Sequence, residues 1–199
     1  MFKDLTTKQK ISFFSIIIVV SGIIGWLYEV IFYYFNGGMK EIYFRGGNFL
    51  PFINIYAYGA ILIIFFTKKY IKKPMKVFFI SMISSGILEY LSGFVLFGIL
   101  GWNRAWDYNT EILNFGNING YVCLRSVLFF GLSGLFLMYV IVPLLLKIVK
   151  SKHSNLVFYI SIIICGLFLC DEIYNLLITK IFHLPNAIKI YKSIGVHYM

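Results

Sequence analysis

The sequence predicts an all-α fold, a polytopic transmembrane helical bundle with about five spans in one domain, residues 1–199. Of its 199 residues, 60% are hydrophobic and 13% are charged, whereas a soluble domain is about 45–50% apolar and about 25% charged. Five apolar runs are separated by loops that hold most of the lysines. A run of about 20 apolar residues is long enough to cross the bilayer core. We therefore expect a multi-pass protein of the cell membrane, with the lipid bilayer as its main surroundings.

The expected spans follow the apolar runs in chain order. They cover about residues 11–35, 51–66, 77–100, 121–148 and 157–178. Asn36, Gly37 and Gly38 break the helix after the first span. Pro51 suits the first turn of the second, short span, where a missing N–H group costs nothing. Residues 179–199 form a tail of apolar residues and lysines, a composition that also suits the membrane interface.

Positive charge is distributed unevenly between the two sides of the expected bundle. Eleven lysines lie before the first span, after the second, and at the end of the fourth or just after it, against six lysines and arginines in the other loops and the tail. Because cytoplasmic loops carry the excess of positive charge, we expect the N-terminus in the cytoplasm and, with five spans, the C-terminus outside. A re-entrant segment in place of one span would return the C-terminus to the cytoplasm. The net charge of +10 comes from short clusters, so no nucleic-acid partner is expected.

Ionisable side chains stand inside the apolar runs. They are Glu29, Glu89, Asp171, Glu172 and Arg125. Each costs roughly 2.5–3.5 kcal/mol in lipid, so these side chains are expected to face one another, water or a ligand. With the expected orientation they all fall in the outer half of the membrane or at its rim. Ser21 and Gly25 share a helix face with Glu29, and such small residues are typical of contacts between membrane helices.

The candidate site adds residues of the two loops expected on the outer side. The substrate- or ion-binding candidates are Glu29, Arg45, Glu89, Asp107, Asn119, Arg125, Asp171 and Glu172. Two interpretations are open: the carboxylates only pair with Arg125 and lock the bundle, or they also bind a ligand, an ion or a proton. Four carboxylates against one arginine favour the second, because some of them must then be protonated or meet a cation. We expect Glu29 and Glu89 in the same cluster, capped by Arg125 or Arg45.

Motifs of soluble catalytic and metal sites are missing from the sequence. It has no G-x-x-x-x-G-K-[ST], no G-x-S-x-G and no H-E-x-x-H, the patterns of P-loop, hydrolase and zinc-protease sites. Its three cysteines and three histidines lack the spacing of a metal or redox site. The sequence therefore predicts no metal site and leaves any cofactor open.

Several short stretches together resemble a known family. They are Gly25-Trp26-Leu27-Tyr28-Glu29, Arg45-Gly46, Pro51-Phe52, Ile55-Tyr56, Gly59, Ile87-Leu88-Glu89-Tyr90, Trp106-Asp107-Tyr108, and Asn119-Gly120 with Cys123. In their order and spacing, over about residues 20–145, the chain resembles the bacterial membrane proteins described as putative ABC-transporter type IV, or CmpB-like permeases. It departs where the family usually has Gly, Pro, Gly and Arg, at Leu50, Asn54, Ala57 and Tyr121. The resemblance implies a membrane permease that works with a separate ATPase subunit.

Three functions compete at this stage. The first is a permease or transporter component whose outward carboxylates bind a cation or cationic solute, or carry protons. The second is a membrane enzyme for a lipid-linked or extracytoplasmic substrate, with Glu29, Glu89 or Asp107 as acid–base groups or ligands of a divalent cation. The third is a non-catalytic accessory subunit whose charges pair internally. Transport is favoured over catalysis, and a second copy of the chain is a further candidate partner.

Overall fold

Helices make up most of the described part of the protein, and loops connect them. A computed structural model describes residues 2–102 and 104–197, and within them it contains helices and one isolated bridge between Ile118 and Val122. Four helical segments of the described chain are long and apolar enough to cross a membrane: residues 7–36, 74–99, 124–149 and 154–181. These four helices confirm the expected all-α membrane bundle. A helix suits a spanning segment because it satisfies every backbone polar group internally.

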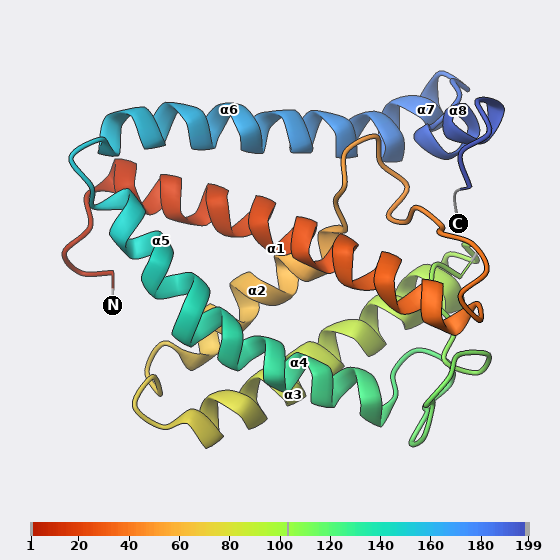
Figure 1. The fold of residues 1–199 in the computed structure, drawn as a ribbon, viewed down its shortest axis with the longest axis horizontal. Coiled ribbons are helices and arrows are strands. Elements are labelled where there is room, and N and C mark those ends of the chain that lie inside the picture. The colour runs from red at the N-terminus through yellow and green to blue at the C-terminus, as the bar shows by residue number, and fades with distance from the viewer. Residues whose placement is uncertain (1, 103, 198–199) are drawn as a thin grey trace. The chain divides into compact units, whose positions relative to one another are not determined.

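Three of the four long segments contain a π-helical stretch. The elements in chain order are α1 (Thr7–Asn36), α2 (Asn54–Thr67), α3 (Pro74–Gly93), η1 (Phe94–Ile99), α4 (Leu124–Phe136), η2 (Leu137–Ile141), α5 (Val142–Val149), α6 (Ser154–Ile173), η3 (Tyr174–Ile178), α7 (Thr179–Ile181) and α8 (Ala187–Ser193) (Figure 1). The stretch η1 follows shortly after Glu89, and η3 follows directly after Glu172 and Ile173. Such stretches are rare and are frequent at functional sites.

The second expected span is shorter than the other four and starts later than the sequence suggested. α2 has 14 residues, a length of about 21 Å at 1.5 Å per residue, against about 30 Å for the bilayer core. Pro51 lies before the helix, in a segment whose preceding backbone N–H groups are bound by α6. Those of Phe49 and Leu50 donate to the carboxylate of Asp171. That α2 crosses the membrane stays a prediction.

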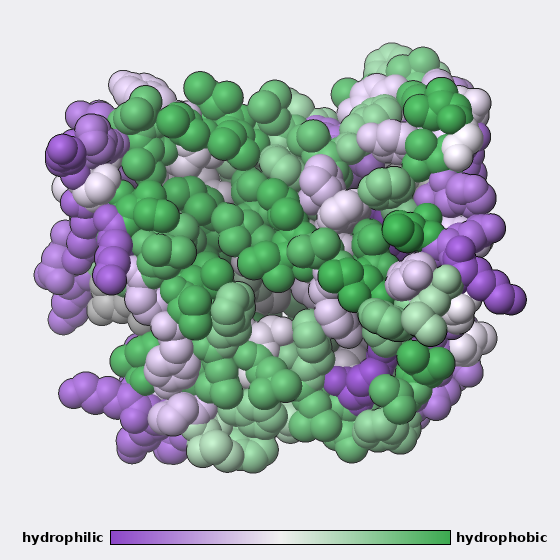
Figure 2. All heavy atoms as spheres, viewed as in Figure 1, coloured by the Kyte–Doolittle hydropathy of each residue, from purple (hydrophilic) through white to green (hydrophobic). Residues whose placement is uncertain are grey.

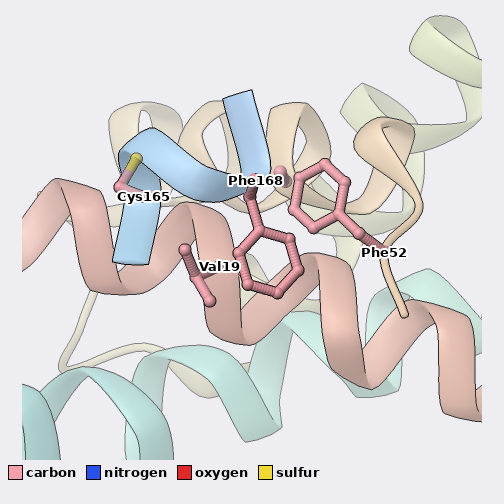
Figure 3. Packing of buried hydrophobic residues seen from close by; sticks show 5 residues of the cluster. Val19, Phe52, Cys165 and Phe168 are labelled. Carbon is pink, nitrogen blue, oxygen red and sulfur yellow. The ribbon is translucent and has the colours of Figure 1, made fainter. Parts of the chain in front are cut away.

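The chain divides into two compact units, of which the first contains residues 1–58 and 145–199. In this unit α1 and α6 pack side by side (Figure 1). Their contact is filled by the apolar cluster of Val19, Phe52, Ala57, Cys165 and Phe168, in which the rings of Phe52 and Phe168 lie 5.2 Å apart (Figure 3). This packing fixes the start of α2 against α1 and so positions the polar residues farther along α1.

The second unit contains residues 59–144. Here α3 packs along α4, and the loop before α4 folds back on η1. Trp106 of this loop donates from Nε1 to the carbonyl oxygen of Tyr121 at 3.0 Å, and its ring lies 4.7 Å from that of Phe97. The fourth helix therefore starts at Leu124, after these loop contacts, and not at Tyr121 as expected. The single domain over residues 1–199 stays a prediction.

Apolar side chains cover much of the outer surface of the long helices. Along α6 the surface in view is apolar, and hydrophilic residues gather where the helix begins (Figure 2). The exposed apolar residues of α6 include Leu156, Tyr159, Ile163 and Leu167. An apolar helix surface of this extent matches contact with lipid chains, which supports the interpretation of α6 as a membrane span.

The orientation of the helices is testable by labelling cysteines from outside the cell. We expect Lys40→Cys, in the loop after α1, to react with a membrane-impermeant maleimide, and Lys72→Cys, in the lysine-rich loop before α3, to react only after permeabilisation. Both positions are exposed, and the expectation follows from the positive-inside rule. The protein with its native cysteines alone gives the background. Labelling of Lys72→Cys but not Lys40→Cys in intact cells would reverse the topology, and labelling of both would make α2 re-entrant.

Candidate functional site: two polar clusters

Glu29 of α1 is joined to an arginine from the loop that follows this helix. Nε of Arg45 donates to Oε2 of Glu29 at 3.0 Å, and the two side chains are only 7% and 17% exposed. The guanidinium carbon of Arg45 lies 3.6 Å from the ring centroid of Tyr33. The hydroxyl of Tyr56 donates to Oε1 of Glu29 at 3.2 Å. These four residues, Glu29, Tyr33, Arg45 and Tyr56, are called the Glu29 cluster below.

Local structure explains how the Glu29 cluster forms. Tyr33 follows Glu29 by four residues, so both side chains lie on the same face of α1. Gly25, one turn earlier, lets the ring of Tyr56 lie directly against the helix, because a Cβ at this glycine would stand 2.1 Å from Cγ of Tyr56. Close approach of Tyr56 to the helix in turn brings its hydroxyl to Glu29. A glycine on a spanning helix thus serves the polar contact as well as the packing.

Asp171 and Glu172, at the end of α6, hold the same loop farther along. Asp171 accepts hydrogen bonds from the backbone N–H groups of Phe49 and Leu50 at 3.1 and 2.7 Å. Glu172 accepts from the side-chain amides of Asn48 and Asn54 at 2.7 and 2.5 Å. Each of the four carboxylate oxygens therefore accepts a hydrogen bond from the protein. We call this set the loop clamp.

The C-terminal tail is tied to the loop clamp. Asn175 donates to Oδ1 of Asp171 at 2.8 Å and accepts from the backbone N–H of Ala187 at 2.8 Å. The hydroxyl of Tyr191 donates to the carbonyl oxygen of Phe49 at 2.9 Å. The start of α8 therefore packs against η3 and the loop clamp, and Ala187 is fully buried there. A position of this tail at the membrane interface stays a prediction.

Glu89 lies in a buried polar cluster of the second unit. It is 6% exposed, and its two oxygens accept hydrogen bonds from the hydroxyls of Tyr108 at 2.5 Å and Ser126 at 2.8 Å. The donors come from the loop before α4 and from the first turn of α4. Burial, together with the negative charge of Glu89, raises the pKa of Tyr108 well above its usual value of 10.0, so this hydroxyl stays a donor at physiological pH. Glu89, Tyr108 and Ser126 are called the Glu89 cluster.

Arg125 pairs with a carboxylate that lies outside the apolar runs. Its Nη2 donates to Oε2 of Glu111 at 2.7 Å, and the side chains are 13% and 4% exposed. The guanidinium carbon also lies 5.2 Å from the ring centroid of Tyr108. The charge count in the sequence therefore needs correction, because Glu111 takes up Arg125 and the loop residue Arg45 takes up Glu29.

Asp107 and Asn119 shape the exposed part of the loop between η1 and α4. Oδ1 of Asp107 accepts from Nη1 of Arg104 and from the side chain of Asn109, both at 2.8 Å. Asn119 donates to the hydroxyl of Tyr90 at 3.2 Å. Gly120 has a φ of +75°, and a Cβ there would lie within 2.5 Å of Arg104, Asn109 and Asp107. Both candidates thus have partners that order the loop.

The structure groups the eight candidates by unit. Unit 1 holds Glu29, Arg45, Asp171 and Glu172, and unit 2 holds Glu89, Asp107, Asn119 and Arg125. A common cluster of Glu29 and Glu89 stays a prediction. The sequence analysis missed several polar partners of the candidates: Tyr33, Asn48, Asn54, Tyr56, Tyr108, Glu111 and Ser126. The spacing of Tyr33 from Glu29 and the position of Ser126 next to Arg125 were the available signals. Among the described residues no group of three or more His, Cys, Asp or Glu could hold a metal ion.

The long apolar helices with buried charged side chains define an integral membrane protein. The chain belongs to the family described as putative ABC-transporter type IV, which matches residues 16–176. This match confirms the resemblance, extends it into η3, and makes the chain a transporter-like membrane protein. Comparison with curated proteins and with solved structures gives no match.

The close approach at Gly25 predicts a measurable cost of adding one methyl group. Gly25→Ala should lower the free energy of unfolding by about 1–3 kcal/mol, because the ring of Tyr56 must shift. Gly166→Ala on α6 is the control, since nothing lies within 4 Å of an added Cβ, and it should be neutral or stabilising by up to about 1 kcal/mol. Reversible unfolding in SDS-containing micelles, followed by circular dichroism, measures both. Equal effects would show that Tyr56 does not lie against α1.

The raised pKa of Tyr108 predicts a pH-dependent contribution to stability. Because the folded pKa exceeds the unfolded value, the stabilisation is complete below about pH 10 and is lost as pH rises through the folded pKa. The difference in unfolding free energy between the wild type and Tyr108→Phe should therefore shrink above about pH 10. Tyr159→Phe, at an exposed position of α6, should show no such dependence. A Tyr108→Phe difference that stays constant across this range would refute the assignment.

Proposed function

We propose that the chain is a permease component of the cell membrane that crosses it several times and binds a cation or cationic solute at Glu29 and Glu89. One observation carries the proposal, and it recurs in both units. A spanning helix holds a carboxylate that is largely shielded from solvent, Glu29 at 17% or Glu89 at 6% exposed, and this carboxylate contacts a side chain of the loop that follows the helix, Arg45 or Tyr108.

Burial of these carboxylates in apolar helices is the physical argument for a ligand. An ionisable residue inside a membrane segment is costly and marks a pathway or binding site by default. The hydroxyl donors of the Glu89 cluster hold the carboxylate in place without cancelling its charge. In the Glu29 cluster the carboxylate already holds a cationic group, that of Arg45. Both arrangements suit recognition of positive charge.

The loop clamp supports a different role for Asp171 and Glu172. Their oxygens accept hydrogen bonds from the loop after α1, so these carboxylates serve as a scaffold. Internal pairing of this kind is what an accessory subunit would show throughout. We therefore restrict the proposed binding groups to the Glu29 and Glu89 clusters and assign the loop clamp to positioning.

A separate ATPase subunit is the proposed energy-supplying partner. The family description names an ABC transporter, a class in which ATP hydrolysis drives transport, and the sequence has no P-loop motif. The lysine-rich loop between α2 and α3 lies on the side that the positive-inside rule places in the cytoplasm, where ATP is found.

Ligand-induced stabilisation tests the binding proposal on the purified chain in nanodiscs. The panel contains sodium, potassium, magnesium, methylammonium, methylguanidinium and choline as chlorides at equal ionic strength. A cation at about 100 times its Kd stabilises the folded state by about 2.7 kcal/mol and raises the unfolding midpoint. We expect at least one member of the panel to do so in the wild type.

Charge-neutral variants assign the effect. The rise in midpoint should disappear in Glu29→Gln or in Glu89→Gln, and it should persist in Asp4→Asn, which removes one exposed negative charge near the N-terminus. A midpoint that no cation raises, or a rise that survives in both glutamine variants, would exclude the proposed function and favour an accessory role.

A further inference from the structure

We infer that the Glu29 cluster is a binding site for a guanidinium-type organic cation, and that Arg45 occupies it as a tethered competitor. The inference rests on the proposed function and names the class of its solute. It starts from the fact that Arg45 is a loop residue whose side chain is 7% exposed and lies against a spanning helix.

The chemistry of the cluster fits a flat, delocalised cation. A carboxylate oxygen of Glu29 binds the edge of the guanidinium at 3.0 Å, and the ring of Tyr33 covers its face with the centroid 3.6 Å from the central carbon. Guanidinium groups combine planar hydrogen bonding with stacking on aromatic faces, whereas an ammonium is a compact and strongly hydrated point charge. A divalent metal ion would need several oxygen ligands, and an aromatic face supplies none.

The second partner of Glu29 keeps the binding groups in place. The hydroxyl of Tyr56 donates to Oε1 at 3.2 Å, and the ring of Tyr56 is fixed against Gly25. The remaining oxygen, Oε2, is the one that meets the cation. Departure of Arg45 would therefore leave an oriented carboxylate beside an aromatic face, which is a preformed site for the cation that replaces it.

The side chain of Arg45 can leave Glu29 while the rest of the loop stays anchored. Gly46 and Gly47 follow it with φ values of +97° and +79°, and the loop clamp begins at the next residue, Asn48. Glycine adopts these left-handed conformations without steric cost. Gly46 lies against the carbonyl oxygen of Phe52, where an added Cβ would stand 2.4 Å away, so the loop stays anchored on this side when the arginine side chain leaves Glu29.

Trp26 provides a reporter for this movement. Its ring stacks on that of Phe44, the residue before Arg45, with centroids 5.7 Å apart and an interplanar angle of 21°. Displacement of Arg45 from Glu29 shifts Phe44 and changes the surroundings of the indole. The fluorescence of Trp26 therefore reports the competition in the wild-type protein, without any substitution in the Glu29 cluster.

The experiment is a titration of the wild-type chain in nanodiscs with methylguanidinium chloride, followed by tryptophan emission. We expect a saturable change that potassium chloride at the same ionic strength does not produce and that Trp26→Phe abolishes. Glu29→Gln should remove it. Tyr33→Leu should weaken binding about 5- to 30-fold, the range expected for loss of a cation–π contact, and Tyr33→Phe should retain most of the affinity.

Removal of the tethered competitor gives the decisive comparison. Arg45→Ala should bind methylguanidinium at least about tenfold more tightly than the wild type by calorimetry, because the site is no longer mostly occupied. A salt bridge of purely structural importance would give no gain in affinity. If Arg45→Ala does not fold on its own, methylguanidinium should restore its folded yield and potassium should not. In the double variant Arg45→Ala with Glu29→Gln, methylguanidinium should no longer restore the yield.

The possible results separate this inference from the proposed function. A wild type that shows no response to methylguanidinium, a response unchanged by Glu29→Gln, or an Arg45→Ala variant that neither binds more tightly nor is restored would overturn the inference. In that case, stabilisation by another cation that depends on Glu89 would leave the proposed function standing. If no cation of the panel stabilises the protein either, both the inference and the proposed function are refuted.

Discussion

A carboxylate buried in an apolar helix needs a donor within reach, and in this protein much of the fold follows from that requirement. The loop after α1 returns so that Arg45 meets Glu29, and it then continues across Asp171 and Glu172 before α2 begins. The loop before α4 likewise brings Tyr108 to Glu89 and Glu111 to Arg125. An unpaired buried charge costs several kcal/mol. These contacts therefore stabilise both the position of each loop and the burial of the charged side chain on the helix.

The kinds of donor differ between the clusters, and this difference separates scaffold from candidate site. The loop clamp uses backbone N–H groups and side-chain amides, which cannot change their charge and which the short loop positions precisely. The Glu29 cluster uses a guanidinium and an aromatic face. The Glu89 cluster uses two hydroxyls, which both donate and accept. We therefore assign recognition of a cation to the Glu29 and Glu89 clusters, and placement of the loop to the loop clamp.

The long helices could be predicted from the sequence, but most of the residues that contact their charged side chains could not. Apolar runs identified every long segment because a spanning helix must satisfy its own backbone polar groups, and the short stretches around Glu29 and Glu89 were enough to identify the family. α2 begins at Asn54 and not at Pro51, and the segment before it is held by a contact that the sequence does not reveal, from Leu50 to Asp171, 121 positions away. The pair of Arg125 and Glu111 was not foreseen because Glu111 lies in a polar loop, where no periodic pattern marks it as buried.

The hydroxyl of Ser126 has one hydrogen atom and two acceptors. Its oxygen lies 2.8 Å from Oε2 of Glu89 and 2.9 Å from the carbonyl oxygen of Cys123. When it donates to the carboxylate, Glu89 is held as an anion; when it donates to the carbonyl oxygen of Cys123, its lone pairs can accept a hydrogen bond from a protonated Glu89. The switch between these arrangements is a rotation about one C–O bond, which for a side-chain torsion takes about picoseconds to nanoseconds. The α3–α4 pair can therefore keep the same packing in both charge states of Glu89, so that gain or loss of a proton would require no helix movement.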